Sequence, residues 1–329
     1  MTEGALPLIE GDHGAAVIDL HERLSALGLG PLTDPHGTFG PSTRGLVEQF
    51  QRLRGLRIDG TVGPNTWATL VEAGLSLGAR LLYRAHPMLR GDDVAELQAR
   101  LCSLGFDTGR VDGIFGDQTA GALAEFQRNL GIAPDAMAGP VTVDELRRVS
   151  MRHEETELVT SVREREARRS SPATLRDRHL GLGEIGEMGA LTAALARFLG
   201  QAGARVSVLH HPEESGQAAE ANAAGVEVYL GLRLNAAERV ATAAYYSGYS
   251  YESGPGRELA EALSARLGTM TGELVSVEGM SVAVLRETQM PAVILELGPT
   301  ERVVEHAAIL AEALADAVVN WAEATANLK

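Results

Sequence analysis

The sequence is poor in cysteine, aromatic residues and basic residues. Its 329 residues include one cysteine, Cys102, so no disulfide bond can form within the chain. Phe, Trp and Tyr make up 4% of the residues, which argues against a platform of aromatic rings that stacks on sugars. The 44 acidic residues outnumber the 29 basic ones and give a net charge of −15. This charge argues against nucleic acids and anionic membranes as partners, because both would be repelled.

Long hydrophobic runs are also absent. No apolar segment reaches the ~18 residues that a membrane-spanning helix needs, so we expect no membrane insertion. The first residues, MTEGALPLIEGDHG, contain neither the basic nor the apolar region of a secretory signal peptide. We therefore expect a cytoplasmic protein, although a chain that begins after a removed signal peptide would look the same.

The N-terminal half contains an internal repeat. Residues 14–73 and 91–149 match at a separation of 77 positions, which becomes 76 after a one-residue deletion. Each copy predicts three short helices: the first ends at a Leu-Gly pair, a glycine-containing turn precedes the second, and a Gly-Pro pair precedes the third. The matched pairs include Leu27-Gly28 with Leu104-Gly105, Phe39-Gly40 with Phe115-Gly116, Phe50-Gln51 with Phe126-Gln127, and Gly63-Pro64 with Gly139-Pro140.

The repeat resembles the peptidoglycan-binding domain 1 family, in tandem. The D-G-x-F-G-x-x-T box, the F-Q pair and the D-G-x-x-G-P-x-T box occur in order in one or both copies. Two turns depart from this pattern: residues 34–37 of the first copy read DPHG, and the second copy has Ala136 where a turn glycine is expected. The resemblance implies a peptidoglycan-related ligand, while the same boxes can equally serve the folding of each copy. We assign residues 1–74 and 75–150 to the two modules.

Two further parts follow the repeat. Residues 151–177 alternate acidic and basic side chains and predict a charged linker helix with a solvated surface. From Arg178 onward, strand and helix patterns alternate, which predicts an α/β domain over 178–329 with a mostly parallel sheet and helices on both faces. The expected strands are 178–183, 205–209, 227–233, 242–249, 281–285 and 291–296, and the expected helices are 186–202, 213–224, 254–267 and 301–326.

The most informative of these strands lies within Met290 to Gly298, MPAVILELG. A continuous apolar run is typical of a strand buried on both sides in the middle of a parallel sheet, and Pro291 fits only at its start. Glu296 is the single carboxylate of the run and lies near its carboxyl end. In open α/β sheets, ligands bind at this end of the strands. Glu296 is therefore either a functional residue of a site or one half of a buried ion pair.

The C-terminal domain resembles the zinc-dependent N-acetylmuramoyl-L-alanine amidases of the Amidase_3 family. The resemblance rests on Ala221-Asn222 followed by Gly225, on YLGLRLNA at 229–236, and on the segment from Val284 to Gly298. It implies a catalytic base at Glu296. It also implies a zinc ligand at Glu184, with Glu187 as the second choice, and two histidine ligands.

Both histidine positions of that zinc site are lost in this sequence. Arg233 replaces one of them, and a guanidinium has no lone pair for a metal and would repel a cation. The loop that holds the other is missing, because the strand that contains His179 runs directly into Glu184. His210 and His211 are the only plausible substitutes, but adjacent side chains of an extended segment point oppositely, so at most one can face the site. We expect neither zinc nor another cofactor.

The same positions predict a salt bridge in place of the metal. A buried charge without a partner is unfavourable, so we expect Arg233 to pair with one or both carboxylates at the ends of neighbouring strands. Glu213 and Glu214 are interpreted as the first turn of a helix, where acids favour the helix dipole. A cluster of tyrosines after the Arg233 strand predicts either a ligand or partner surface or half-exposed strand residues. The candidate ligand-binding residues are Arg233, Glu184, Glu296, Asn235, Tyr245 and Tyr246.

Together these features predict a catalytically inactive amidase-like protein that binds peptidoglycan precursors or muropeptides. The resemblance to CwlM-like amidase regulators of actinobacteria implies a cell-wall synthesis enzyme, the enolpyruvyl transferase MurA, as protein partner. Two alternatives stay open. One is an active zinc-dependent N-acetylmuramoyl-L-alanine amidase, and the other is a plain muropeptide-binding protein.

Overall fold

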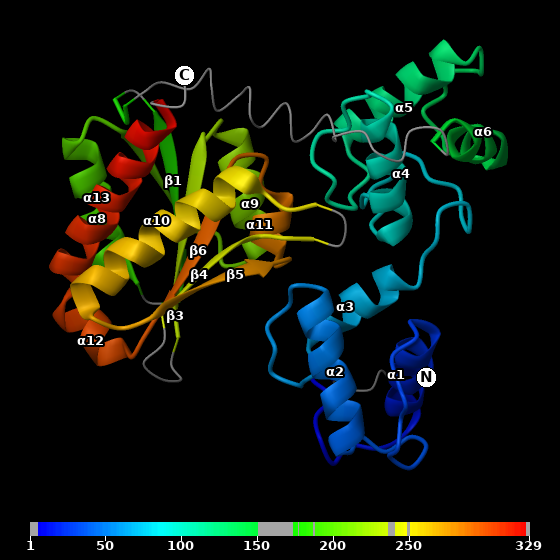
Figure 1. The fold of residues 1–329 in the computed structure, drawn as a ribbon, viewed down its shortest axis with the longest axis horizontal. Helices are drawn as coiled ribbons and strands as arrows, with labels where there is room; N and C mark the ends of the chain where they lie inside the picture. The colour runs from blue at the N-terminus through cyan, green and yellow to red at the C-terminus, as the bar shows by residue number, and fades with distance from the viewer. Residues whose placement is uncertain are drawn as a thin grey trace. The chain divides into compact units, whose positions relative to one another are not determined.

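The computed structural model describes residues 6–150, 174–176, 178–186, 188–235, 241–248 and 251–326. The chain divides into two units, one built around the repeat and the other around a β-sheet (Figure 1). The charged helix predicted over 151–177 falls largely outside the described residues. No helix of the described part is both long and apolar enough to cross a bilayer.

Each copy of the repeat folds as three helices around an apolar core of its own. We call the two copies module 1 and module 2. Leu27 and Leu104 cap the first helix of each module, and Gly28 and Gly105 then adopt positive φ, as the Leu-Gly pairs predict. The helices are α1 (Ala15–Ala26), α2 (Pro41–Leu53) and α3 (Pro64–Ala73) in module 1, and α4 (Asp92–Ser103), α5 (Asp117–Asn129) and α6 (Pro140–Ser150) in module 2.

The described strands of the second unit form one sheet in the order β2-β1-β3-β6-β4-β5. Neighbouring strands are parallel except β4 and β6, which are antiparallel, so the predicted mostly parallel sheet is confirmed. β6 lies inside the sheet and all its residues are buried, as its apolar run predicts. The strands are β1 (His179–Ile185), β2 (Arg205–Leu209), β3 (Val228–Leu234), β4 (Ala241–Tyr246), β5 (Val275–Met280) and β6 (Ala292–Leu297).

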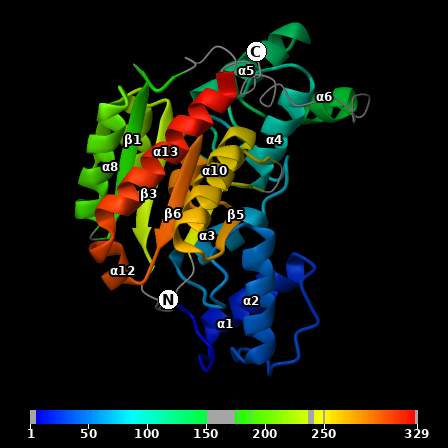
Figure 2. The same cartoon turned by 60° about the vertical axis from the view of Figure 1, so that its left-hand side comes forward.

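Helices cover both faces of this sheet (Figures 1 and 2). The larger apolar core lies on one face, where leucines of β1 and β3 pack against three long helices. The helices of this face are α8 (Gly189–Gln201), α10 (Gly254–Thr271) and α13 (Ala307–Ala326), with α12 (Thr300–Glu305) beside α8 and α13, and those of the other face are α9 (Glu214–Ala223) and α11 (Ala283–Glu287).

The predictions of two secondary-structure elements are wrong. The strand expected at 281–285 is a short helix, α11, and the edge strand β5 precedes it. The single helix expected over 301–326 is two helices, because α12 ends at Glu305 and α13 begins after His306. In addition, β1 continues to Ile185, so Glu184 belongs to the strand and not to the segment after it.

Candidate functional site

The register of two parallel strands brings Arg233 and Glu296 face to face. β3 and β6 pair these two residues directly. Side chains alternate along a strand, so Tyr229, Gly231 and Arg233 share one face of β3. The hydrogen bond between Tyr229 and Gln217 of α9 shows that this is the face covered by α9 and α11.

Arg233 forms ion pairs with two carboxylates. Its Nη1 lies 3.0 Å from Oε1 of Glu296, and its Nη2 bonds Oε1 of Glu214 in the first turn of α9. The three side chains are 10–21% exposed, so most water is excluded from the cluster. The predicted pairing of Arg233 with Glu296 is confirmed. The role of Glu214 was missed, because a glutamate near a helix start is explained by the helix dipole alone.

Glu184 does not pair with Arg233, contrary to expectation. β1 and β3 are parallel, and the residue of β1 in register with Arg233 is Ile185. Because side chains alternate along β1, Glu184 lies on the opposite face, and its carboxylate is close to Gly189 at the start of α8. Its neighbour Glu187, the second choice for a zinc ligand, lies outside the described residues.

The histidines after β2 do not join the carboxylates either. His210 is exposed, and Nδ1 of His211 accepts a hydrogen bond from the backbone N–H of Glu213 at 3.1 Å. Across the described ranges, no group of three or more His, Cys, Asp or Glu side chains is placed to hold a metal ion. Zinc needs ligands with free lone pairs, whereas Arg233 occupies both Glu214 and Glu296. The residues at this position therefore do not fit a zinc ion.

A buried hydrogen-bond chain lies beside the ion pairs. The hydroxyl of Tyr229 donates to Oε1 of Gln217 at 2.7 Å. Nε2 of Gln217 donates to the backbone carbonyls of Glu184 and His211, each at 2.8 Å. Burial, together with the negative charge of Glu214, raises the pKa of Tyr229 far above its usual range, so its hydroxyl remains a donor. Gln217 thereby fixes α9, and with it Glu214, to the ends of β1 and β2.

The prediction of a tyrosine surface is wrong for the tyrosines that the structure describes. Tyr245 and Tyr246 are 8% and 2% exposed, because β4 is an inner strand of a sheet with helices on both faces. Tyr251, a third tyrosine of the cluster, is 7% exposed, and Tyr249, the fourth, lies outside the described residues. Asn235 continues the pairing of β3 with β6, since its backbone N–H donates to the carbonyl of Leu297 at 2.8 Å. A ligand-binding role of Asn235 remains a prediction.

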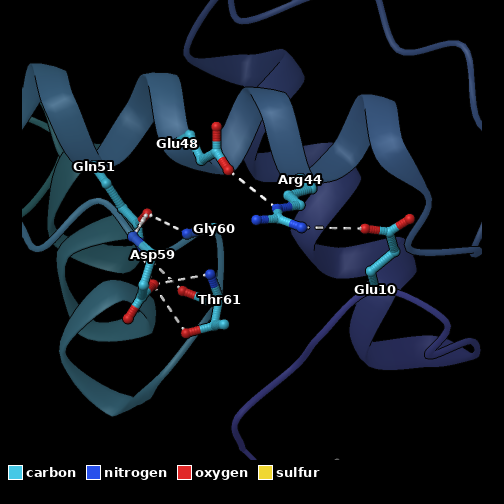
Figure 3. Close-up of polar contacts among 7 residues, drawn as sticks. All are labelled: Glu10, Arg44, Glu48, Gln51, Asp59, Gly60 and Thr61. Carbon is cyan, nitrogen blue, oxygen red and sulfur yellow. Dashed lines mark hydrogen bonds and ion pairs between the residues drawn. The ribbon is translucent and has the colours of Figure 1, made fainter. Parts of the chain in front are cut away.

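The modules contain a second recurrent polar arrangement, which we call the glutamine-held turn. In module 1, Nε2 of Gln51 donates to Asp59 at 2.9 Å, and its Oε1 accepts the backbone N–H groups of Asp59 and Gly60 at 3.1 and 2.9 Å (Figure 3). In module 2, Gln98 holds the turn at Asp112 in the same way. The boxes of the repeat therefore serve the folding of each module.

A third glutamine-held turn tolerates the loss of its glycine. Ala136 has a φ of 56°, a left-handed conformation that no other non-glycine residue adopts within the described ranges. Its N–H donates to Oε1 of Gln127 at 3.0 Å, in the place of the bond between Gly60 and Gln51. The turn at Ala136, which departs from the family pattern, thus keeps the hydrogen bond that Gly60 makes in module 1.

Replacing Gln98 with alanine should loosen the turn that it holds in module 2. Buried partners of the amide would lose their hydrogen bonds, so we expect the module to be destabilised by about 1–2 kcal/mol. Hydrogen exchange measured by mass spectrometry should show faster exchange of the amides at 112–114. Glu125→Ala, a change at an exposed position of α5, is the control and should leave this exchange unaltered. Equal protection in Gln98→Ala and in the unaltered chain would contradict the role of the glutamine.

Comparison with known proteins covers both parts of the chain. Residues 13–70 and 90–146 match the family model described as a putative peptidoglycan binding domain. N-acetylmuramoyl-L-alanine amidase CwlM of Mycobacterium tuberculosis (strain ATCC 25618 / H37Rv) is 34% identical over 328 residues, which cover 88% of this chain and 80% of that protein. A probable N-acetylmuramoyl-L-alanine amidase of Bacillus licheniformis is 30% identical over 151 residues, 41% of this chain and 43% of that protein.

Solved structures also match part of this chain. The N-acetylmuramoyl-L-alanine amidase AmiC2 of Nostoc punctiforme matches 44% of this chain and 98% of its own, at 15% identity and a TM-score of 0.37. The match to CwlM is more informative, because it extends over both the repeat and the sheet. This chain, which carries two peptidoglycan-binding domains ahead of an amidase-like α/β domain, therefore belongs to the N-acetylmuramoyl-L-alanine amidase family represented by CwlM.

Proposed function

We propose that this chain is a catalytically inactive amidase-like protein that binds peptidoglycan precursors or fragments. The observation that carries the proposal is the pairing of Arg233 with Glu214 and Glu296 at the carboxyl end of β3. In the Amidase_3 pattern a zinc-binding histidine falls at the position of Arg233. A guanidinium gives no lone pair to a metal, and it leaves the two carboxylates engaged.

Binding is supported by the two matched domains, and a protein partner is proposed in addition. The resemblance to CwlM-like regulators supports a cell-wall synthesis enzyme of the MurA type as that partner. An active N-acetylmuramoyl-L-alanine amidase is the second candidate, because both of the relatives reported above carry that name. A muropeptide-binding protein without a protein partner is the third.

Metal content and amidase activity separate the first two candidates. The purified full chain is incubated with zinc chloride, passed through a desalting column and examined by plasma mass spectrometry. A second portion of the same sample is incubated with purified sacculi, and an active zinc amidase is assayed in parallel as the positive control. We expect no stoichiometric zinc and no release of stem peptides, while the chain still sediments with the sacculi. One tightly bound zinc ion per chain, together with released peptides, would overturn the proposal.

A pull-down separates the regulator from the plain binding protein. The full chain is immobilised and mixed with purified MurA in the presence and absence of muropeptides. Retention of MurA is the result expected for a regulator. If MurA is not retained while muropeptides still bind, the chain is a muropeptide-binding protein and the MurA part of the proposal fails.

A further inference from the structure

The α/β domain contains a cavity at one edge of its sheet. The volume of the cavity is about 360 Å³, within the range of small-molecule sites. It lies where β6 ends and where β4 and β5 begin, because Leu297, Ala241 and Val275 all line it. Residues of α10, α12 and α13 form the other walls. In open α/β sheets, ligands bind at the carboxyl ends of strands, and β6 presents such an end to the cavity.

The cavity and the Arg233 cluster lie on opposite faces of the sheet. The side chain of Glu296 points to the face that α9 covers, where it meets Arg233. Side chains alternate along a strand, so Leu297, the next residue of β6, points to the face that α10 and α13 cover. The cavity is therefore separate from the position at which the Amidase_3 pattern places its metal ion.

The walls of the cavity are mainly apolar. Leu267, Leu297 and Leu310 are at most 7% exposed and belong to the larger core of the domain. Two other apolar side chains of the lining remain in water, because Leu274 is 87% and Ile309 is 56% exposed. Exposed apolar side chains gathered at a hollow are typical of a binding site. An apolar group that enters the cavity would remove them from water, which is favourable.

Arg302 of α12 brings a positive charge to the lining. Its side chain is 53% exposed, and its Nη1 donates to Oε1 of Glu273 at 2.6 Å. A guanidinium has five N–H donors, and within the described residues Arg302 gives one of them, to Glu273. Arg233 and Arg257 of the same domain each hold two carboxylates. Arg302 can therefore hold a second carboxylate beside Glu273.

We propose that this cavity binds a small amphiphile, a single apolar chain that ends in a carboxylate, as in a medium-chain fatty acid. The chain lies among the leucines of the wall, and the carboxylate accepts hydrogen bonds from the guanidinium of Arg302. A cationic head fits less well, because it would be repelled by Arg302 and would compete with it for Glu273. The site lies wholly within the α/β domain, so it is independent of ligand binding by the two modules.

Calorimetric titration of the full chain with sodium decanoate, below the concentration at which it forms micelles, tests the site. We expect decanoate to bind. Acetate has the same head without the chain and should show no measurable binding. Decyltrimethylammonium has the same chain with the opposite charge and should bind about tenfold more weakly than decanoate, or less. Equal affinity for the two charged amphiphiles would contradict recognition of the head by Arg302.

Arg302→Gln is the informative variant, because its exposed position allows the change without disturbing the core. We expect it to bind decanoate about tenfold more weakly, the effect of one lost charge-assisted hydrogen bond. Arg266→Gln is the matched control. Arg266 also pairs with a single carboxylate, Asp316, and is 40% exposed, but it lies outside the lining of the cavity. This variant should bind decanoate as the unaltered chain does.

Carbon-13 NMR of the methionine methyl groups locates the ligand independently. Met270 lines the cavity, whereas Met137 lies in module 2. Saturating decanoate should shift the methyl resonance of Met270 and leave that of Met137 in place. Absence of decanoate binding, equal affinity of Arg302→Gln and the unaltered chain, or an unmoved Met270 resonance would overturn the site. A shift of Met270 with protein concentration alone would show that a second copy of the chain fills the cavity, and it would overturn the proposal as well.

Discussion

Arg233→Met is expected to lower the free energy of unfolding of the α/β domain by about 2–4 kcal/mol. Without the guanidinium, Glu214 and Glu296 would face each other as two mostly buried carboxylates without a counter-charge. The range lies below that of a fully buried pair, because the cluster keeps some contact with water. Urea unfolding followed by the fluorescence of buried Trp321 measures the loss, in a Trp67→Phe background that removes the other tryptophan.

The domain offers a matched control for this change. Arg257 also pairs with two glutamates, Glu252 and Glu261, but its side chain is 54% exposed. Arg257→Met should therefore leave the stability almost unchanged. Combining Arg233→Met with glutamine at both carboxylate positions should restore most of the loss, because no charge is then left unpaired. Equal losses in the two arginine variants would contradict a special role for the Arg233 cluster.

Gly183→Ala should destabilise the same domain by about 3 kcal/mol, through overpacking. A Cβ atom at this position would lie 2.0 Å from the hydroxyl oxygen of Tyr229 and 2.3 Å from Oε1 of Gln217. Both neighbours are buried and bonded to each other, so neither side chain can move without breaking their hydrogen bond. Thermal unfolding of the full chain, followed by Trp321 in the background described above, measures the change.

Gly200→Ala is the control for the glycine substitution. This glycine lies in α8, and a Cβ built on it has no heavy atom within 4 Å apart from its chain neighbours and the backbone of its own helix. Alanine should therefore stabilise the helix by about 0.5–1 kcal/mol. Adding Tyr229→Phe to Gly183→Ala removes the closest oxygen and should recover part of the loss. If Gly183→Ala melts as the unaltered chain does, the close approach of Tyr229 to β1 would be refuted.

Features determined by neighbouring residues could be predicted from the sequence. The ends of α1 and α4 follow from Leu-Gly pairs, and β6 follows from one continuous apolar run. The pairing of Arg233 with Glu296 could also be predicted, because both residues end parallel strands. Local pattern failed at α11, where Val282, Val284 and Leu285 resemble a strand because five residues are too few to show a helical period.

Features determined by sheet register could not be predicted in this way. β1 ends at Ile185, two residues later than the pattern indicates, so Glu184 belongs to the strand and lies on the face opposite to Arg233. Glu214 reaches Arg233 because Gln217 anchors α9 at the strand ends, a contact without a local sequence signal. The tyrosines of β4 were misjudged because an aromatic pair on a strand does not reveal whether helices cover both faces.

The bridge between Glu214 and Glu296 does not depend on an ion taken from solution. A cation recruited from solution holds two carboxylates only as tightly as its free concentration allows, so the support that it gives fades as that concentration falls. The cation here is the side chain of Arg233 and cannot dissociate. The carboxyl ends of β3 and β6 therefore stay joined to α9 under chelation or metal starvation.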